Sequence, residues 1–287
     1  MKIDTLILSG GGPSGVSYFG IFKALFEKKI IDSELKGIKE IITTSVGIIP
    51  SIFFMLGVPL NIGENIIMNY NFKNMLDTDN LTIDNILVDF GIFDTIGVSK
   101  LIQSVLKNYT GKEDYNLLEF FDKTKIKLTV KVFNSTRSQV QYLSYESNPD
   151  LSLLKLVQMT TAIPLFFKPV KYNDELYVDG GMRGHFPIEI CESDNYFGIF
   201  ITGGTVNHDS SLIKLFPILE YFYSLIINQD QIIYDIKNNK KDKRIIFNRV
   251  DYGLNFDMPM EDKLNIIDIA YKSTINHIKQ HLEIDTT

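Results

Sequence analysis

Three short segments of this sequence contain residues that could do chemistry, and the first centres on Ser45. The apolar, largely β-branched run 41–44 ends at this serine, and Gly47 and a helical apolar pattern follow at once. A serine at a sharp strand-to-helix turn projects its hydroxyl clear of the backbone, as a nucleophile requires. A serine that caps the helix explains the same pattern, and Thr43 stands where the motif G-x-S-x-G has its first glycine. Ser45 is therefore a candidate nucleophile whose role depends on its partners.

The second segment is a glycine-rich loop between a strand pattern at residues 5–8 and a helical pattern from Val16 onward. Its amides favour negative charge, and three interpretations are open: an oxyanion hole for acyl transfer, a dinucleotide-binding G-x-G-x-x-G loop, or a tight turn without a ligand. The dinucleotide interpretation needs a second strand that ends in an acid, and only Ile30-Ile31 precedes the suitably placed Asp32. The glycines of the loop are Gly10, Gly11, Gly12 and Gly15.

The two segments follow successive strand patterns, which places them together in an open α/β sheet. The carboxyl ends of neighbouring parallel strands lie side by side, and ligands bind there. An amide-rich loop beside an exposed serine is the arrangement that acyl transfer needs. This pairing favours the oxyanion hole over the dinucleotide site.

The third segment is Asp179-Gly180-Gly181, which follows a strand pattern at residues 175–178. A strand-end aspartate can point its carboxylate into a site, although an ordinary Asp-Gly turn is the commoner explanation. The tripeptide alone does not decide between them.

The elements that must position these segments form an α/β pattern. We expect one domain over residues 1–287, with a central, mostly parallel sheet and helices on both faces, a three-layer sandwich. Residues 61–112 are expected to form a helical cap or packing layer. Strand patterns cover residues 5–8, 40–43, 126–133 with 140–145 as a hairpin, 175–178, 196–201 and 244–248; helical patterns include 151–159, 212–227 and 261–280.

Composition narrows the classes of function. The 29 lysines and arginines against 35 acids give a net charge of −6, which argues against nucleic acid as the main partner. The single cysteine, Cys191, excludes an intrachain disulfide. No secretory signal or bilayer-spanning run is evident, so we expect a cytoplasmic protein whose membrane contact, if any, is peripheral.

The order of the three segments resembles the patatin-like phospholipases, lipid acyl hydrolases with a serine–aspartate dyad. The likeness extends to Thr161-Ala162-Ile163-Pro164 ahead of the aspartate and to the helical pattern at 262–271. It covers residues 5–181 and continues more faintly to about Lys272. Two positions depart from the family pattern: Thr43 replaces the usual glycine, and Ser14 replaces a usual basic residue.

The resemblance implies a role for each motif. Ser45 matches the nucleophile and Asp179 the base that takes its proton. The glycine loop (Gly10, Gly11, Gly12, Gly15) matches the oxyanion hole, with the amides of Gly11 and Gly12 as donors. The motif positions are Thr43, Gly47, Gly180 and Gly181. The family works without a metal, a cofactor or a catalytic histidine.

The histidines are consistent with a dyad. Of the four, His277 and His281 are spaced as one face of a terminal helix, and His208 lies in no motif. His185, six residues after Asp179, is the one that could have a minor part in the site. A dyad then requires Asp179 to act directly as the base, which a dry site would favour by raising its basicity.

The sequence therefore predicts a serine hydrolase that cleaves carboxylic esters of phospholipids or related lipids at a membrane surface and releases fatty acid. The alternative in another class is a weakly active or inactive lipid-binding scaffold with the same fold. A nicotinamide- or flavin-dependent oxidoreductase is a distant third interpretation.

Overall fold

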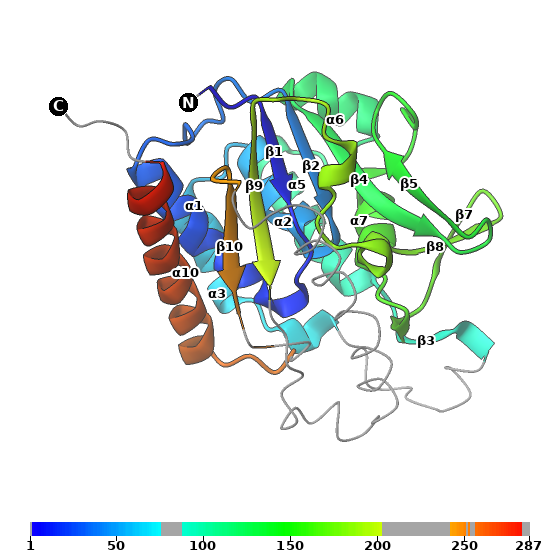
Figure 1. The fold of residues 1–287 in the computed structure, drawn as a ribbon. Helices are drawn as coiled ribbons and strands as arrows, with labels where there is room; N and C mark the ends of the chain where they lie inside the picture. The colour runs from blue at the N-terminus through cyan, green and yellow to red at the C-terminus, as the bar shows by residue number, and fades with distance from the viewer. Residues whose placement is uncertain (1, 76–87, 203–241, 251, 253–255, 283–287) are drawn as a thin grey trace.

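The computed structural model describes residues 2–75, 88–202, 242–250, 252 and 256–282 (Figure 1). The predicted helix at 212–227 and His208 lie outside the described residues. Among the residues described, no helix is both long enough and apolar enough to cross a membrane.

A mixed sheet of eight strands forms the centre of the fold and confirms the predicted α/β class. Its parallel part orders the strands β10-β9-β1-β2-β4, and β8, β7 and β5 complete it as antiparallel strands. The predicted hairpin is confirmed as β4–β5, and the strand pattern at 244–248 is confirmed as β10, which ends the described strand order. The strands are β1 (Thr5–Leu8), β2 (Glu40–Thr44), β4 (Lys127–Asn134), β5 (Gln139–Leu143), β7 (Val170–Tyr172), β8 (Glu175–Asp179), β9 (Tyr196–Thr202) and β10 (Ile245–Arg249).

Strand β4 brings β2 and β8 together end to end. β5 pairs with residues 130–134 of β4 along one edge, so β2 and β8 must share the other edge. Thr44 at the end of β2 pairs with Lys131, and Asp179 at the end of β8 pairs with Val132. Adjacent positions of one strand therefore hold the ends of the two strands that carry Ser45 and Asp179.

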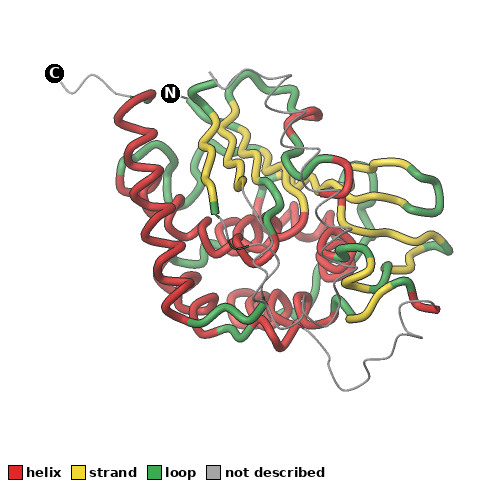
Figure 2. The backbone as a smooth tube through the Cα atoms, turned by 60° about the horizontal axis from the view of Figure 1, so that its bottom comes forward, coloured by secondary structure: helices red, strands yellow, loops and turns green. Residues whose placement is uncertain are grey.

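The described helices pack into one large apolar core with one face of the sheet, and Figure 2 shows them gathered mainly on one side of the strands. The closest approach is between α1 and α10: a Cβ on Gly20 would lie 2.0 Å from the carbonyl oxygen of Ile267, so only glycine fits there. The helices are α1 (Ser17–Glu27), α2 (Ile48–Met55), α3 (Leu60–Asn69), α5 (Ile96–Thr110), α6 (Leu117–Thr124), α7 (Leu153–Thr161) and α10 (Met260–His281).

The opposite face of the sheet carries a smaller apolar cluster. Ile7, Phe200 and Ile245 project there, because side chains alternate along a strand, and Phe186 covers them. Cys191 packs at the rim of this cluster. In the described part of the chain, the covering layer is the irregular segment after β8, which contains the 3-10 turns η4 (Gly180–Arg183) and η5 (Ile188–Ile190) and no α-helix.

A second, two-stranded sheet was not predicted from the sequence. It pairs β3 (Gly91–Phe93) with β6 (Leu165–Phe167), within regions expected to be helical or irregular. A Cβ on Gly91 would lie 2.3 Å from the carbonyl carbon of Phe167, so the glycine permits this close pairing. Phe93, Phe166 and Phe167 pack in an aromatic cluster that also includes Phe256.

Candidate active site

Ser45 lies at a sharp turn between β2 and the 3-10 turn η2 (Ser45–Gly47), which leads into α2. Its φ is +53°, a left-handed conformation that is uncommon for a residue with a side chain. The surrounding structure holds it there, because the Ser45 amide donates to Thr160 Oγ1 at 2.8 Å. Such a turn presents the hydroxyl beyond the strand end, as the sequence pattern predicts for a nucleophile.

Thr43 fits this turn because Gly47 leaves room for it. A Cβ on Gly47 would lie 2.4 Å from Thr43 Oγ1 and 2.7 Å from the carbonyl oxygen of Ser9. Thr43 Oγ1 instead donates to the carbonyl of Leu8 at 3.1 Å and joins β2 to β1. The departure from the family's glycine is thus accommodated by the glycine on the other side of Ser45.

Asp179 meets Ser45 directly. Ser45 Oγ donates to Asp179 Oδ2 at 2.5 Å, and the amide of Gly181 donates to the other carboxyl oxygen at 2.7 Å. Burial raises the pKa of Asp179 to about 7, against the hydrogen bonds from Ser45 and Gly181 and the charge of Lys131, which lower it. The carboxyl group can therefore exchange a proton near neutral pH, as a general base must.

The four glycines of the loop differ in hydrogen bonding and in packing. The amide of Gly10 donates to the carbonyl of His185 at 2.7 Å, so the prediction that Gly10 contributes to the oxyanion hole is wrong for its N–H group. Within the residues the structure describes, the amides of Gly11 and Gly12 donate to no protein acceptor. Gly15 permits close packing, because its Cβ would lie 2.6 Å from a methyl group of Val46. Gly11 and Gly12 are therefore the glycines of this loop with amides available to a developing oxyanion.

Hydrogen bonds from α1 and β9 to Ser9 hold the start of the glycine loop in place. The hydroxyl of Tyr18 donates to the Ser9 carbonyl at 2.6 Å, and the Ile201 amide donates to Ser9 Oγ at 2.9 Å. Gly12 adopts a φ of +52°, which glycine reaches at no steric cost. These contacts fix the loop between β1 and β9 before any ligand arrives.

His185 lies beside the site but is not bonded to Ser45 or Asp179. Its Nε2–H donates to the carbonyl of Ile201 at 3.1 Å, and its ring packs on Phe200. Burial lowers its pKa to about 4, so it is neutral throughout the physiological range. Ser45 thus has an aspartate and not a histidine as its hydrogen-bond acceptor.

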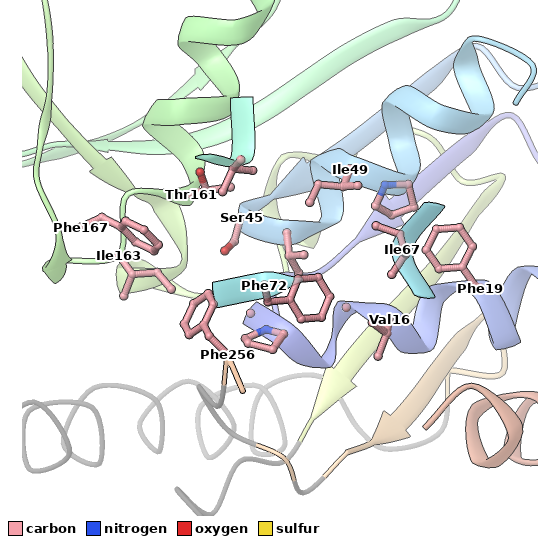
Figure 3. Close-up of a pocket in the computed structure, with 16 residues that line it drawn as sticks. Val16, Phe19, Ser45, Ile49, Ile67, Phe72, Thr161, Ile163, Phe167 and Phe256 are labelled. Atoms are coloured by element: carbon pink, nitrogen blue, oxygen red, sulfur yellow. The ribbon is translucent and has the colours of Figure 1, made fainter. Parts of the chain in front are cut away.

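An apolar pocket opens over Ser45, and Figure 3 shows the serine hydroxyl directed into it. The pocket encloses about 620 Å³ of space, which includes open solvent at its mouth. Among the described residues that line it, Ser45 and Thr161 are the ones with polar side chains. Phe167, Ile163 and Phe256 face the serine from one side, and Ile67, Phe19 and Val16 close the other (Figure 3).

Sequence reasoning missed two residues that support the site. Thr160 accepts from the Ser45 amide and donates to the carbonyl of Lys131 at 2.9 Å. Lys131 is buried, with 1% of its surface exposed, and the signal that could have found it is a lysine between Val130 and Val132 in the middle of a strand. In the described ranges, no cluster of three histidine, cysteine or acidic side chains could hold a metal ion.

Comparison with known proteins decides the family. Residues 6–191 match the profile described as patatin-like phospholipase. The chain belongs to this family. The profile includes Ser45, Asp179 and the glycine loop, and ends shortly after the predicted core of the likeness at Gly181.

Two relatives of this patatin-like chain are viral proteins. It is 30% identical over 189 residues to "Probable lipid hydrolase 463L" of Invertebrate iridescent virus 6, a match that covers 65% of this chain and 62% of that protein. It is 22% identical over 286 residues to protein R571 of Acanthamoeba polyphaga mimivirus, which covers 96% and 94% of the two chains. The match with the lipid hydrolase thus spans less than two thirds of that protein's length.

A solved structure supports the fold. The crystal structure of VipD from Legionella pneumophila superposes with a TM-score of 0.66 at 16% sequence identity, and covers 98% of this chain and 67% of VipD. At this identity the likeness concerns the α/β architecture, in which a central sheet and its helices present the strand ends described above.

Proposed function

We propose that this patatin-like protein is a serine hydrolase that cleaves carboxylic esters of phospholipids or related lipids and releases fatty acids. The observation that carries the proposal is the 2.5 Å hydrogen bond from Ser45 Oγ to Asp179 Oδ2 at the base of an apolar pocket. The family and the relative named as a probable lipid hydrolase support the substrate class.

The reaction begins when Asp179 takes the proton of Ser45 as the hydroxyl attacks the ester carbonyl. The amides of Gly11 and Gly12 then donate to the oxyanion of the tetrahedral intermediate. When the intermediate collapses, Asp179 returns the proton to the leaving alcohol, and the acyl group stays on Ser45. A water molecule attacks this acyl-enzyme, Asp179 takes its proton, and Ser45 regains a proton as the fatty acid leaves.

Proton transfer sets the expected pH dependence. Asp179 must be ionised to act as a base, and burial raises its pKa to about 7. Activity should therefore rise as the pH passes through 7 and level off above it. The same burial makes the carboxylate a stronger base than one in water, which helps it to deprotonate a serine without a histidine.

The pocket suits the acyl chain of the substrate. A fatty acyl chain offers only apolar surface, and each buried methylene contributes about 0.8 kcal/mol to binding. Phe72, Val98 and Ile67, from the region predicted as a cap or packing layer, complete the wall of this pocket. That region thus covers the site as well as packing the core.

Exposed apolar side chains near the pocket suit contact with a lipid surface. Val88 and Phe90 are 72% and 59% exposed and precede β3, whose Phe93 packs against the pocket residue Phe167. Ile96, 49% exposed, begins the helix that supplies Val98 to the pocket. Peripheral docking of this face would bring the pocket to lipids that lie in a bilayer.

A fluorophosphonate probe tests the proposal. We expect the purified chain to be labelled at Ser45 and to release fatty acid from mixed phospholipid vesicles, with which it should co-sediment. Ser45→Ala should abolish labelling and lower hydrolysis at least about 1,000-fold. Ser51→Ala is the matched control, because Ser51 is a buried serine in α2 whose hydroxyl donates to the Gly47 carbonyl. A folded chain that is neither labelled nor active would support the scaffold alternative instead.

A further inference from the structure

Lys131 is a buried cation with every proton of its ammonium group engaged. An isolated charge in a protein interior is costly, so it persists only where partners satisfy it. Lys131 Nζ donates to the carbonyls of Arg183 and Gly184 at 2.7 and 2.8 Å and to Glu189 Oε1 at 2.5 Å. An ammonium has three donors, and all three are used.

Two of these acceptors, the carbonyls of Arg183 and Gly184, belong to the segment that directly follows Asp179. This segment begins with the 3-10 turn η4 (Gly180–Arg183) and continues through Gly184 to His185. The carbonyl of His185 accepts from the amide of Gly10 at 2.7 Å. The lysine therefore holds the stretch of chain that connects Asp179 to the glycine loop.

The backbone of the same lysine supports the serine. Its carbonyl accepts from Thr44 Oγ1 at 3.2 Å and from Thr160 Oγ1 at 2.9 Å, and Thr160 Oγ1 in turn accepts from the Ser45 amide. Gly180 packs on that carbonyl so closely that a Cβ would lie 2.5 Å from the oxygen. Lys131 thus contacts both Thr160, which holds the Ser45 amide, and Gly180, which follows Asp179.

We propose that Lys131 is the positioning residue of the Ser45–Asp179 pair: its ammonium group clamps segment 180–185 so that the aspartate and the glycine loop stay aligned with the serine. This inference rests on the proposed function for its effect on catalysis. The clamp itself is independent of the reaction, because it concerns bonds within the folded protein.

The cation also acts on the carboxylate electrostatically. The groups around Asp179 are the Ser45 hydroxyl, the Gly181 amide, the neutral His185 and the Lys131 ammonium. Arg183 lies over the ring of Phe133, and Glu189 pairs with Lys131. Lys131 is the cation that lowers the pKa of Asp179, so its removal should raise that pKa further.

The test compares Lys131→Met with Lys131→Arg on a short-chain, water-soluble ester. We expect Lys131→Met to lower kcat about 100-fold with little change in KM. The substitution should misalign Ser45 and Asp179 but leave the acyl pocket unchanged. The acid limb of the kcat profile should move up by roughly one pH unit, and Lys131→Arg should restore part of both losses.

Lys127→Met is the matched control. Lys127 lies four residues earlier on the same face of β4 and also pairs with glutamates, Glu146 at 2.5 Å and Glu40 at 3.5 Å, but it does not contact segment 180–185. Its removal should leave the pH profile unchanged. A Lys131→Met variant with native kcat and a native pH profile would overturn the proposal.

Two measurements work even if the chain proves to be no hydrolase. Carboxyl-carbon NMR should give a higher pKa for Asp179 in Lys131→Met, and amide exchange at residues 181–185 should be faster. If the native chain lacks activity but both changes appear, the clamp stands and the proposed function fails. If Lys131→Met does not fold, Glu189→Gln, which removes one acceptor charge at a half-exposed side chain, should also make amide exchange at residues 181–185 faster, by a smaller factor. Native amide exchange in that variant would equally overturn the clamp.

Discussion

The two sides of Ser45 differ in what holds them together. Toward the pocket, the serine faces aromatic and aliphatic side chains that make no directional bonds. Toward the sheet, hydrogen bonds connect Ser45 to Asp179 and, through Thr160, to Lys131. The ammonium group of Lys131 bonds the backbone of the segment that follows Asp179. Packing tolerates a change in ligand shape, whereas hydrogen bonds fix atoms to within a fraction of an ångström. Under the proposed function, the pocket side would set the substrate range and the sheet side the chemistry.

The largest expected effect comes from the polar side, through Asp179→Asn. The amide keeps the shape of the carboxyl group but cannot take the serine proton, so kcat should fall about 1,000-fold or more. Stability should change in the opposite direction. The folded-state pKa of about 7 lies above the ordinary aspartate value of 3.8, so the native protein loses stability as the pH rises from about 4 through 7. Asparagine avoids this cost.

Thermal unfolding measured against pH checks this prediction. Asp179→Asn should be more stable than the native chain above pH 7, by at most roughly 4 kcal/mol, and the gain should shrink toward pH 4. Asp174→Asn is the control, because the side chain of Asp174 is 94% exposed in the β7–β8 turn. A gain that does not vary with pH would show that Asp179 is not desolvated.

A smaller and more selective effect is expected on the apolar side, from Val98→Leu. The added methylene projects into the pocket from the first turn of α5, so long acyl chains should lose about tenfold in kcat/KM while acetyl esters change little. Val105→Leu adds the same group two turns later on α5, at a buried position that does not line the pocket. Equal losses for short and long esters would mean that the acyl chain binds elsewhere.

The sequence predicts the local features of the site but not the long-range pairing that brings them together. The strand patterns at 5–8, 40–43 and 175–178 and the motifs at their ends are local in the sequence, so the parallel core, the Ser45 turn and Asp179 could all be predicted. The hydrogen bond between the Ser45 hydroxyl and the Asp179 carboxyl group requires β2 and β8 to share one edge of β4. This is a long-range pairing that sequence periodicity does not encode. The resemblance supplied that pairing.

The other features that the sequence does not predict depend on contacts between segments that are distant in the chain. The small sheet β3–β6 forms because Gly91 can lie against Phe167, which is distant in the chain. Gly10 looks like its neighbours in sequence, yet the carbonyl of His185 takes its amide. That the chain forms a single domain over residues 1–287 stays a prediction.

Thr43→Val should have the smallest effect of these variants. It distinguishes residues that stabilise the β1–β2 pair from residues that position Ser45. The methyl group keeps the shape beside Gly47, but the hydrogen bond from Thr43 Oγ1 to the Leu8 carbonyl is lost, which should cost about 1 kcal/mol of stability. Thr160→Val removes a hydroxyl of the same kind that bonds both Ser45 and Lys131, so kcat should fall well beyond the change seen for Thr43→Val. Urea unfolding and ester hydrolysis of the two variants measure both quantities. If Thr43→Val lowered kcat as much as Thr160→Val does, the Ser45 turn would depend on the β1–β2 bond, and the division between a positioning network and a structural strand would have to be redrawn.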